Sequence, residues 1–401
     1  MKTRRVCEEK KWRRIIISCA TLFLALFSEA YGAGYYNVKF GFHSLFANSI
    51  NSQGNATCAR ISGGVQCWGT NAHAQGGDGT VNTPENPHWV LGMHAGSGVN
   101  LLGVDQNDAC GLVGSSLFCW GYNVDGEEGI GTTAITPTPT LVTGFGSVIA
   151  ISQGSGGADM CVIKAGNVYC SGFNTNDQLG DGLAGDVSVF TAVVGIPAGQ
   201  ATSVSMGQFN GCAIASGALY CWGDNGNGQI GNGVTGSKYN TAQANLTLTS
   251  GVAQVSVGPA AICAMKTNGA LYCWGFDGTG QVGNNNISAT VYNTPQLIVA
   301  SGVTQISNGF NINCAIINGG VQCWGNNNHG QVGDGTIITR GVPTPVVGMS
   351  SGISYITSGN NHACAITGGQ IYCWGLDANG QLGDGGSTDQ HTPVKAIIAN
   401  P

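Results

Sequence analysis

Cysteines are the residues of this 401-residue chain whose type and spacing most directly suggest chemistry. Of its sixteen cysteines, all but Cys7 and Cys19 form seven pairs whose members are nine residues apart, or ten in one pair. The pairs are Cys58 with Cys67, Cys110 with Cys119, Cys161 with Cys170, Cys212 with Cys221, Cys263 with Cys273, Cys314 with Cys323, and Cys364 with Cys373. Structural zinc sites combine cysteines two to four residues apart, and a spacing of nine fits none of them. The pattern therefore favours disulfides over a metal site.

The segment "CAIASGALYC" (212–221) shows how such a disulfide would form. It is typical of two short strands joined by a two-residue turn, which places Cys212 opposite Cys221. The two cysteines would occupy a non-hydrogen-bonded pair with Cα atoms ~4.5 Å apart, within the range that a disulfide bridges. In the fifth pair the extra residue falls in the turn, so Cys263 still faces Cys273. Each bond closes a small loop and would contribute ~2 kcal/mol or somewhat more.

Other patterns that suggest chemistry are weaker. The Gly-Gln-x-Gly loops lack the basic residue and helix start of a phosphate-binding loop. The loop "DNGNG" (224–228) lacks the glutamate that closes a calcium loop. The histidines are scattered, with no H-E-x-x-H motif. We therefore expect no catalytic residue, no cofactor and no metal ligand, and a protein that is not an enzyme.

A tryptophan follows the second cysteine in six of the seven pairs. The series is Trp68, Trp120, Trp222, Trp274, Trp324 and Trp374. A ligand cage is one interpretation of such a series. Residues at one fixed position in six units more simply serve a common packing need, so we expect each tryptophan to pack between neighbouring units.

The N-terminus has the pattern of an export signal. A basic segment precedes the 13-residue apolar run Ile15–Phe27, which is shorter than the ~20 residues that span a bilayer. We predict a signal peptide over residues 1–33, with cleavage after Ala30 or Ala33. Its removal takes away seven basic and three acidic residues and leaves a net charge near −10. That charge disfavours nucleic acid as a partner. We expect no membrane span after cleavage and a secreted, periplasmic or cell-surface location.

The cysteine pairs recur every 50 to 52 residues, which indicates a repeat architecture. In the sixth unit, short strands are predicted over 295–300, 302–309, 313–319 and 320–325, followed by a glycine-rich return over 326–336. Four short strands per ~50 residues are typical of a propeller blade.

The repeated string resembles the regulator of chromosome condensation repeat family. It reads C-A-[IM]-x-x-G-x-[LIV]-[YQ]-C-W-G, continues to G-Q-[ILV]-G-[DN], and ends in "GQVGDG" (330–335) and "GQLGDG" (380–385) in the last two units. Seven phased copies cover residues 45–398. The resemblance implies an all-β, seven-bladed propeller, here as one domain over residues 34–401 in an exported, bacterial-type member.

The chain ends predict how the ring would close. The segment "HTPVKAI" (391–397) is a leading strand with no blade after it, and the first unit has a poorly matching leader over 35–50. We expect the C-terminal strand to complete the N-terminal blade, which would remove exposed sheet edges.

Two departures from the repeat mark its less regular part. Ser171 stands where six units have tryptophan, and Glu127 stands where the other loops usually have glutamine. The glycine before the first cysteine is also displaced in the first three units. We expect these blades to be the least regular.

Three functions fit a propeller of this kind. The first is an exported, disulfide-stapled scaffold, acting as a monomer, that binds a protein or a glycan through loops on one face. The segments between blades vary most and place Trp89, Phe190 and Tyr239 as possible partner contacts. The second, implied by the resemblance, is guanine-nucleotide exchange on a Ras-like GTPase. The third is a structural component of the cell envelope.

Overall fold

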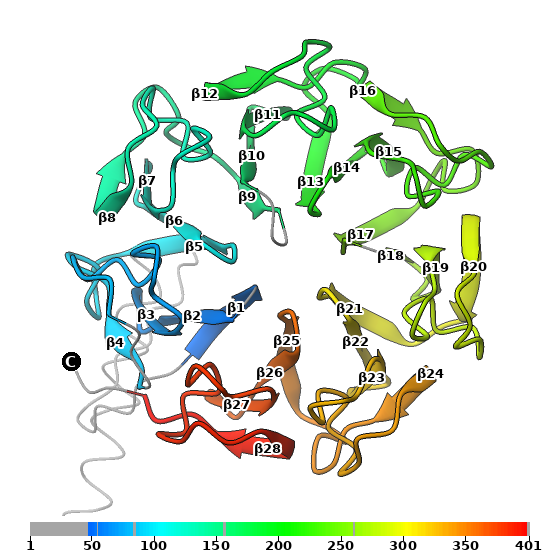
Figure 1. The fold of residues 1–401 in the computed structure, drawn as a ribbon. Helices are drawn as coiled ribbons and strands as arrows, with labels where there is room; N and C mark the ends of the chain where they lie inside the picture. Colours follow the sequence, from blue (N-terminus) through cyan, green and yellow to red (C-terminus); the bar gives the residue numbers. More distant parts are fainter. Residues whose placement is uncertain (1–46, 54, 83–85, 155–157, 260, 399–401) are drawn as a thin grey trace, which may run out of the picture. The chain divides into compact units, whose positions relative to one another are not determined.

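The computed structural model describes residues 47–53, 55–82, 86–154, 158–259 and 261–398. The predicted signal peptide and both of its cleavage sites lie outside these residues. The described chain forms seven four-stranded antiparallel sheets, each from four consecutive strands. Figure 1 shows these blades side by side, with the first strand of each blade innermost and the fourth outermost. The prediction of an all-β, seven-bladed propeller is confirmed.

The blades follow one another along the chain without exchanging strands. The first four are β1 (Ala47–Gln53), β2 (Ala56–Ile61), β3 (Gly64–Gly69), β4 (His88–Trp89); β5 (Val99–Val104), β6 (Asp108–Val113), β7 (Ser116–Gly121), β8 (Thr136–Leu141); β9 (Ala150–Gln153), β10 (Asp159–Lys164), β11 (Asn167–Gly172), β12 (Val187–Ala192); and β13 (Ala201–Met206), β14 (Asn210–Ala215), β15 (Ala218–Gly223), β16 (Tyr239–Ala244). The last three are β17 (Val252–Val257), β18 (Ala261–Lys266), β19 (Leu271–Phe276), β20 (Val291–Val299); β21 (Val303–Asn308), β22 (Ile312–Ile317), β23 (Gly320–Gly325), β24 (Arg340–Pro345); and β25 (Ile353–Ser358), β26 (His362–Thr367), β27 (Gln370–Gly375), β28 (Gln390–Lys395).

A disulfide joins the second and third strands of every blade, as predicted. In the fourth blade Cys212 pairs with Cys221 across β14 and β15, and their Cα atoms are 4.1 Å apart. The turn between them has positive φ at Ser216 (51°) and Gly217 (75°), the two-residue conformation that suits the twist of a hairpin. The longer fifth hairpin keeps the same pairing, with 4.1 Å between the Cα atoms of Cys263 and Cys273. All fourteen cysteines are buried.

Each tryptophan of the series packs against the preceding blade. The indole N–H of Trp222 donates to the carbonyl of Gln178 at 2.7 Å. Gly180, with φ of +65°, lies against the same indole, and a Cβ on Gly180 would be 2.6 Å from the ring. The indoles of the other five tryptophans make the same bond to Gln381, Gln75, Gln229, Gln281 and Gln331. The prediction that tryptophan packs between units is confirmed.

The outer strands are edges that the preceding blade partly covers. Gly182 N–H donates to the Asn240 carbonyl of β16 at 2.8 Å, and Gly233 makes the same bond to Asn293 of β20. Proline further blocks several of these edges, for example Pro137 and Pro139 in β8. Both devices limit pairing with another chain.

The predicted pairing of the C-terminal strand with the first blade is wrong. Strand β28 pairs with β27 in the seventh blade, and the first blade takes all its strands from residues 47–89. The end of the irregular leader lies in the inner strand β1, where Ile50 is fully buried and packs in a cluster with residues of the seventh blade. The first and seventh blades instead meet through side chains, with Trp68 Nε1 2.9 Å from the Gln381 carbonyl oxygen.

Candidate functional site

The loops of the blades lie at two opposite ends of the strands. The long loops between third and fourth strands lie beside the turns between first and second strands: Asp224 N–H donates to the Phe209 carbonyl at 2.8 Å. We call this end the long-loop face. The hairpin turns lie beside the connections between blades, where Val252 N–H donates to the Gly217 carbonyl at 2.9 Å. We call that end the hairpin face.

Side-chain amides clamp the long loops. In the fourth blade Asn225 Oδ1 accepts from Ile230 N–H at 3.0 Å, and its Nδ2 donates to the Val234 carbonyl at 3.1 Å. Asn232 Oδ1 accepts from Val234 N–H at 3.2 Å, so both backbone groups of Val234 are bonded within the loop. The third blade repeats this at Leu183, with Asn174 on its carbonyl and Asp181 on its N–H. The loops are therefore held in a fixed conformation.

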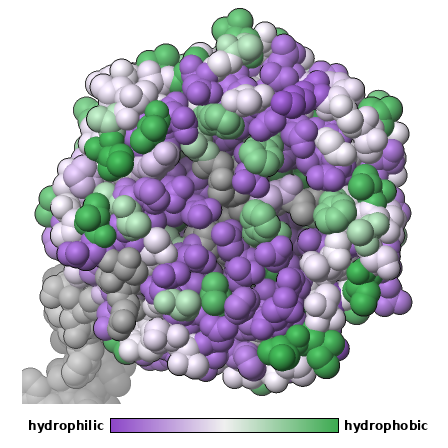
Figure 2. Space-filling model, in the orientation of Figure 1, coloured by the Kyte–Doolittle hydropathy of each residue, from purple (hydrophilic) through white to green (hydrophobic). Residues whose placement is uncertain are grey.

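Exposed aliphatic side chains occupy the same part of these clamped loops in six blades. They are between 45% and 62% exposed. The set, called the long-loop aliphatic residues, is Val81, Ile135, Leu183, Val234, Ile287, Ile337 and Ile338. Figure 2 shows one face of the molecule, where hydrophilic residues surround the centre and the most hydrophobic residues lie nearer the periphery.

A polar cavity of about 230 Å³ lies among the inner strands. Its serines join successive blades: Ser205 Oγ accepts from Val257 N–H at 3.0 Å, and Ser256 Oγ accepts from Asn308 N–H at 2.9 Å. Thr357 Oγ1 accepts from Ser52 N–H at 3.1 Å, so the series also links the seventh blade to the first. These hydroxyls hold the blades together, and the polar cavity they line is large enough for a cluster of water molecules.

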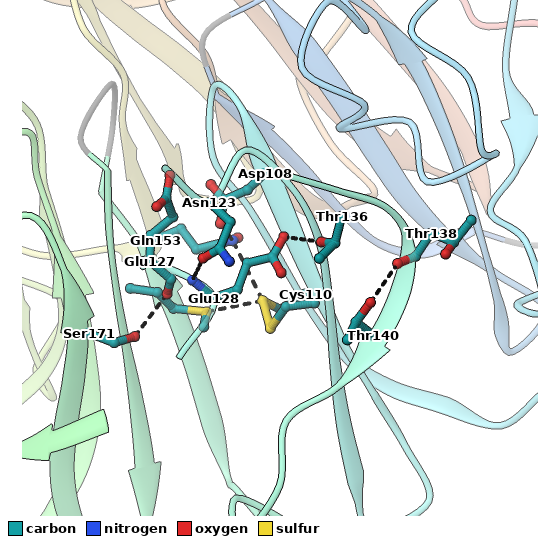
Figure 3. Close-up of a disulfide and its surroundings, with 12 residues drawn as sticks. Asp108, Cys110, Asn123, Glu127, Glu128, Thr136, Thr138, Thr140, Gln153 and Ser171 are labelled. Carbon is teal, nitrogen blue, oxygen red and sulfur yellow. Dashed lines mark hydrogen bonds between the residues drawn. A yellow bond between two sulfur atoms is a disulfide. The ribbon is translucent and has the colours of Figure 1, made fainter. Parts of the chain in front are cut away.

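The second and third blades bury a group of carboxyl side chains between them. Asp105, Asp108, Glu127, Glu128 and Asp159 are each at most 2% exposed. Gln153 Nε2 donates to Asp108 at 2.7 Å, and the Thr136 hydroxyl donates to Glu128 (Figure 3). We call this group the buried carboxyl cluster.

Burial is the main cause of the raised pKa values in this cluster. Loss of solvation raises the pKa of Glu127 to about 7 and that of Glu128 to about 8. Burial, helped by the neighbouring carboxylates, also raises the pKa values of Asp108 and Asp159 well above their ordinary value. Several of these side chains are therefore protonated near neutral pH. Of these five residues the sequence analysis singled out only Glu127. The others could not be grouped from the sequence, because the cluster assembles from loops and strands of two blades.

The same interface explains the missing tryptophan. Ser171 Oγ donates to the Glu127 carbonyl at 2.8 Å, in place of the indole bond of the other blades. Phe190 fills the space of the indole: a Cβ on Gly129 would be 2.5 Å from its ring, and only 8% of Phe190 is exposed. Phe145 supports it, with ring centroids 4.5 Å apart. Phe190 is thus a core residue, and burial removes it from the predicted partner contacts.

The other two predicted contacts lie in different blades. Trp89 is half-buried in β4, packs against the cluster between the first and seventh blades, and has its ring 5.9 Å from that of His94. Tyr239 is half-buried at the start of β16, where its hydroxyl accepts from Asn232 Nδ2 at 3.0 Å. The structure does not bring them together.

His362 and His329 each contact a polar side chain, at separate places in the fold. His362 is fully buried, with Nε2 2.9 Å from Thr57 Oγ1, and burial lowers its pKa to about 4. His329 Nδ1 lies 2.7 Å from Asp389 Oδ2. In the described residues no three His, Cys, Asp or Glu side chains are arranged to hold a metal ion. That part of the chain likewise contains no helix with the length and apolarity of a membrane span.

Comparison with known families supports the repeat assignment. The regulator of chromosome condensation (RCC1) repeat matches residues 268–316, 318–366 and 368–400, and a second RCC1 repeat profile matches residues 252–281. The chain is 27% identical over 273 residues to the ultraviolet-B receptor UVR8 of Arabidopsis thaliana, across 67% of this chain and 62% of that protein. It is 25% identical over 257 residues to the E3 ubiquitin-protein ligase HERC2 of Mus musculus, across 63% of this chain and 5% of that one. The chain thus spans less than two thirds of these relatives.

Solved structures share the fold at low sequence identity. Human WBSCR16 superposes with a TM-score of 0.72 and 20% identity, covering 83% of this chain and 93% of that one. Prp20p of Saccharomyces cerevisiae superposes with a TM-score of 0.74 and 16% identity, covering 88% of this chain and 87% of that one.

Proposed function

We propose that this seven-bladed propeller of RCC1 repeats is an exported scaffold that binds a protein or glycan partner without catalysing a reaction. The observation that carries the proposal is the set of clamped long loops, which present exposed side chains such as Leu183 and Val234 on a rigid frame. Rigid presentation lowers the entropy lost when a partner binds. Trp89 and Tyr239, both half-buried near blade edges, are the proposed aromatic contacts.

Export is supported by the chemistry of the cysteines. Seven disulfides, one in each blade, are of the kind that persists in oxidising compartments. The predicted signal peptide would deliver the chain to such a compartment, where we expect a monomer in the secreted, periplasmic or cell-surface fraction. N-terminal sequencing of the exported protein tests this part, and the first residue should follow Ala30 or Ala33.

The binding proposal is tested with oxidised protein of residues 34–401 as bait. Secreted and envelope proteins, and an array of glycans, are offered to the oxidised bait and to a reduced, urea-unfolded control. We expect one saturable partner that binds the oxidised bait and is lost with the unfolded one. Faster nucleotide release from a Ras-like GTPase would support the exchange alternative. Co-fractionation with the envelope without any discrete partner would support the structural alternative.

A further inference from the structure

The charged side chains of this propeller are divided between its two faces. Every Asp and Glu in the described residues lies in a long loop, at the start of a second strand, or in the turn before it. All of these positions are at the long-loop end. Asp125, Asp186, Asp224 and Asp384 are among those that reach solvent.

The cations lie mostly at the other end. Arg60, Lys164 and Lys266 stand near the ends of second strands, beside the hairpin turns, and Lys395 ends the fourth strand β28. Lys164, for example, pairs with Asn167 across the turn. Of the described cations only Lys238 and Arg340 lie on the long-loop face, and Arg340 is paired with Asp334 at 2.6 Å. The long-loop face therefore carries all of the exposed carboxylates in the described residues and the hairpin face most of the cations.

We propose that the long-loop face docks a protein partner whose surface combines basic and apolar side chains. The inference rests on the proposed binding function and names the face and the chemistry of the partner. Charge complementarity selects a basic partner, because like charges placed opposite each other are costly. The long-loop aliphatic residues select a protein, because exposed apolar side chains rimmed by polar groups are typical of protein interfaces.

The geometry of the loops suits such an interface. Leu183 and Val234 occupy the same position in neighbouring blades, and hydrogen bonds hold the N–H and carbonyl of each. Their side chains are 62% and 48% exposed, with Asp186 and Asp224 in the same two loops. A partner would gain apolar contact without ordering these loops, and the surrounding carboxylates would accelerate its approach at low salt.

The test uses a synthetic peptide of alternating lysine and leucine as a probe with defined chemistry. Two matched peptides, one with glutamate for lysine and one with serine for leucine, separate the two features. Affinity is measured by fluorescence anisotropy at low salt and at about 0.15 M, where the Debye length is ~8 Å. We expect binding of the lysine–leucine peptide alone, and weaker binding at the higher salt.

Variants then show which face of the propeller binds the peptide. The triple substitution Leu183→Ser, Val234→Ser and Ile287→Ser should weaken binding about tenfold. Asp186→Asn, Asp224→Asn and Asp384→Asn should reduce the salt dependence. The matched control Val194→Ser, Leu246→Ser and Val347→Ser removes aliphatic residues of 49%, 75% and 51% exposure from the connections between blades and should change little.

Several results would overturn the inference. They are no binding of the lysine–leucine peptide, equal binding of the glutamate peptide, or equal loss from the control triple. Capture of the natural partner distinguishes failure of this inference from failure of the proposed binding function. If the long-loop triple still captures that partner and unfolding abolishes capture, the protein is a scaffold that uses another surface.

Discussion

Glu128 should make the stability of this protein depend on pH, and replacing it should remove much of that dependence. The side chain is fully buried at a position where the third and fourth blades carry Leu179 and Ile230, which are also fully buried. Burial raises the pKa of Glu128 to about 8, from an ordinary value of 4.5. Because the pKa is higher in the folded protein than in the unfolded chain, the folded state favours the protonated side chain. Its contribution to the free energy of unfolding is complete below about pH 4.5. That stability is lost as the pH rises through 8.

The size of the effect follows from the two pKa values. Each pH unit between them corresponds to ~1.4 kcal/mol, so from pH 5 to pH 8 the side chain lowers the free energy of unfolding by on the order of 3 kcal/mol. Glu128→Gln keeps an oxygen to accept from Thr136 but does not ionise. We expect the variant to gain stability over the parent at pH 8 and to differ little from it at pH 5.

Urea unfolding with the disulfides intact, followed by tryptophan fluorescence, measures this at pH 5 and pH 8. Glu128→Leu, which restores an aliphatic residue, should flatten the pH dependence in the same way. Asp177→Asn serves as the control, because it removes a carboxylate from a half-exposed site in the next long loop. The reasoning is refuted if Glu128→Gln and Glu128→Leu both keep the parent's loss of stability between pH 5 and pH 8.

Three further predictions concern other parts of the fold. Asp377 stands where Asn327 donates to the Thr336 carbonyl at 3.0 Å, and burial raises the pKa of Asp377 from 3.8 to about 7. Asp377→Asn should therefore raise Tm most at pH 8, less at pH 5, and not at all below about pH 3.8. Ser171→Trp should destabilise the protein by ~1–3 kcal/mol, because the indole would overpack against Phe190. Adding Phe190→Ala should recover part of that loss, and additive effects of the two substitutions in a double-mutant cycle would contradict this explanation. Because the cysteines are buried, dithiothreitol should reduce none of the disulfides in the native state and all seven in urea, counted by alkylation and mass spectrometry; reduction at equal rates in both states would contradict it.

The sequence predicted the features that lie within one repeat. Cys212 and Cys221 are close in the chain and share a hairpin, so their pairing follows from the length of the turn alone. Trp222 repeats at a fixed position, which is why its packing against a neighbouring unit was predictable.

Features that depend on contacts between repeats were not predictable in the same way. Phe190 has the appearance of a variable rim residue, and only the position of the third blade against the second shows that it replaces an indole. Asp108 and Asp159 are about fifty residues apart, and only the shared interface brings them near Glu127. The junction of the first and seventh blades was predicted wrongly because the irregular sequence of β1 conceals an inner strand anchored by Ile50.

Each of the seven disulfides joins neighbouring strands of a single blade, and this has a mechanical consequence. When tension is applied at the two chain ends, no disulfide resists the separation of one blade from the next. Only noncovalent contacts oppose it, so the blades should detach one after another. Each detached blade would extend by less than its full contour length, because the residues between its cysteines stay locked in the hairpin. A single-molecule stretching trace should therefore show regularly spaced rupture events, and with a reductant present each rupture should be followed by a further extension as the newly exposed disulfide is reduced.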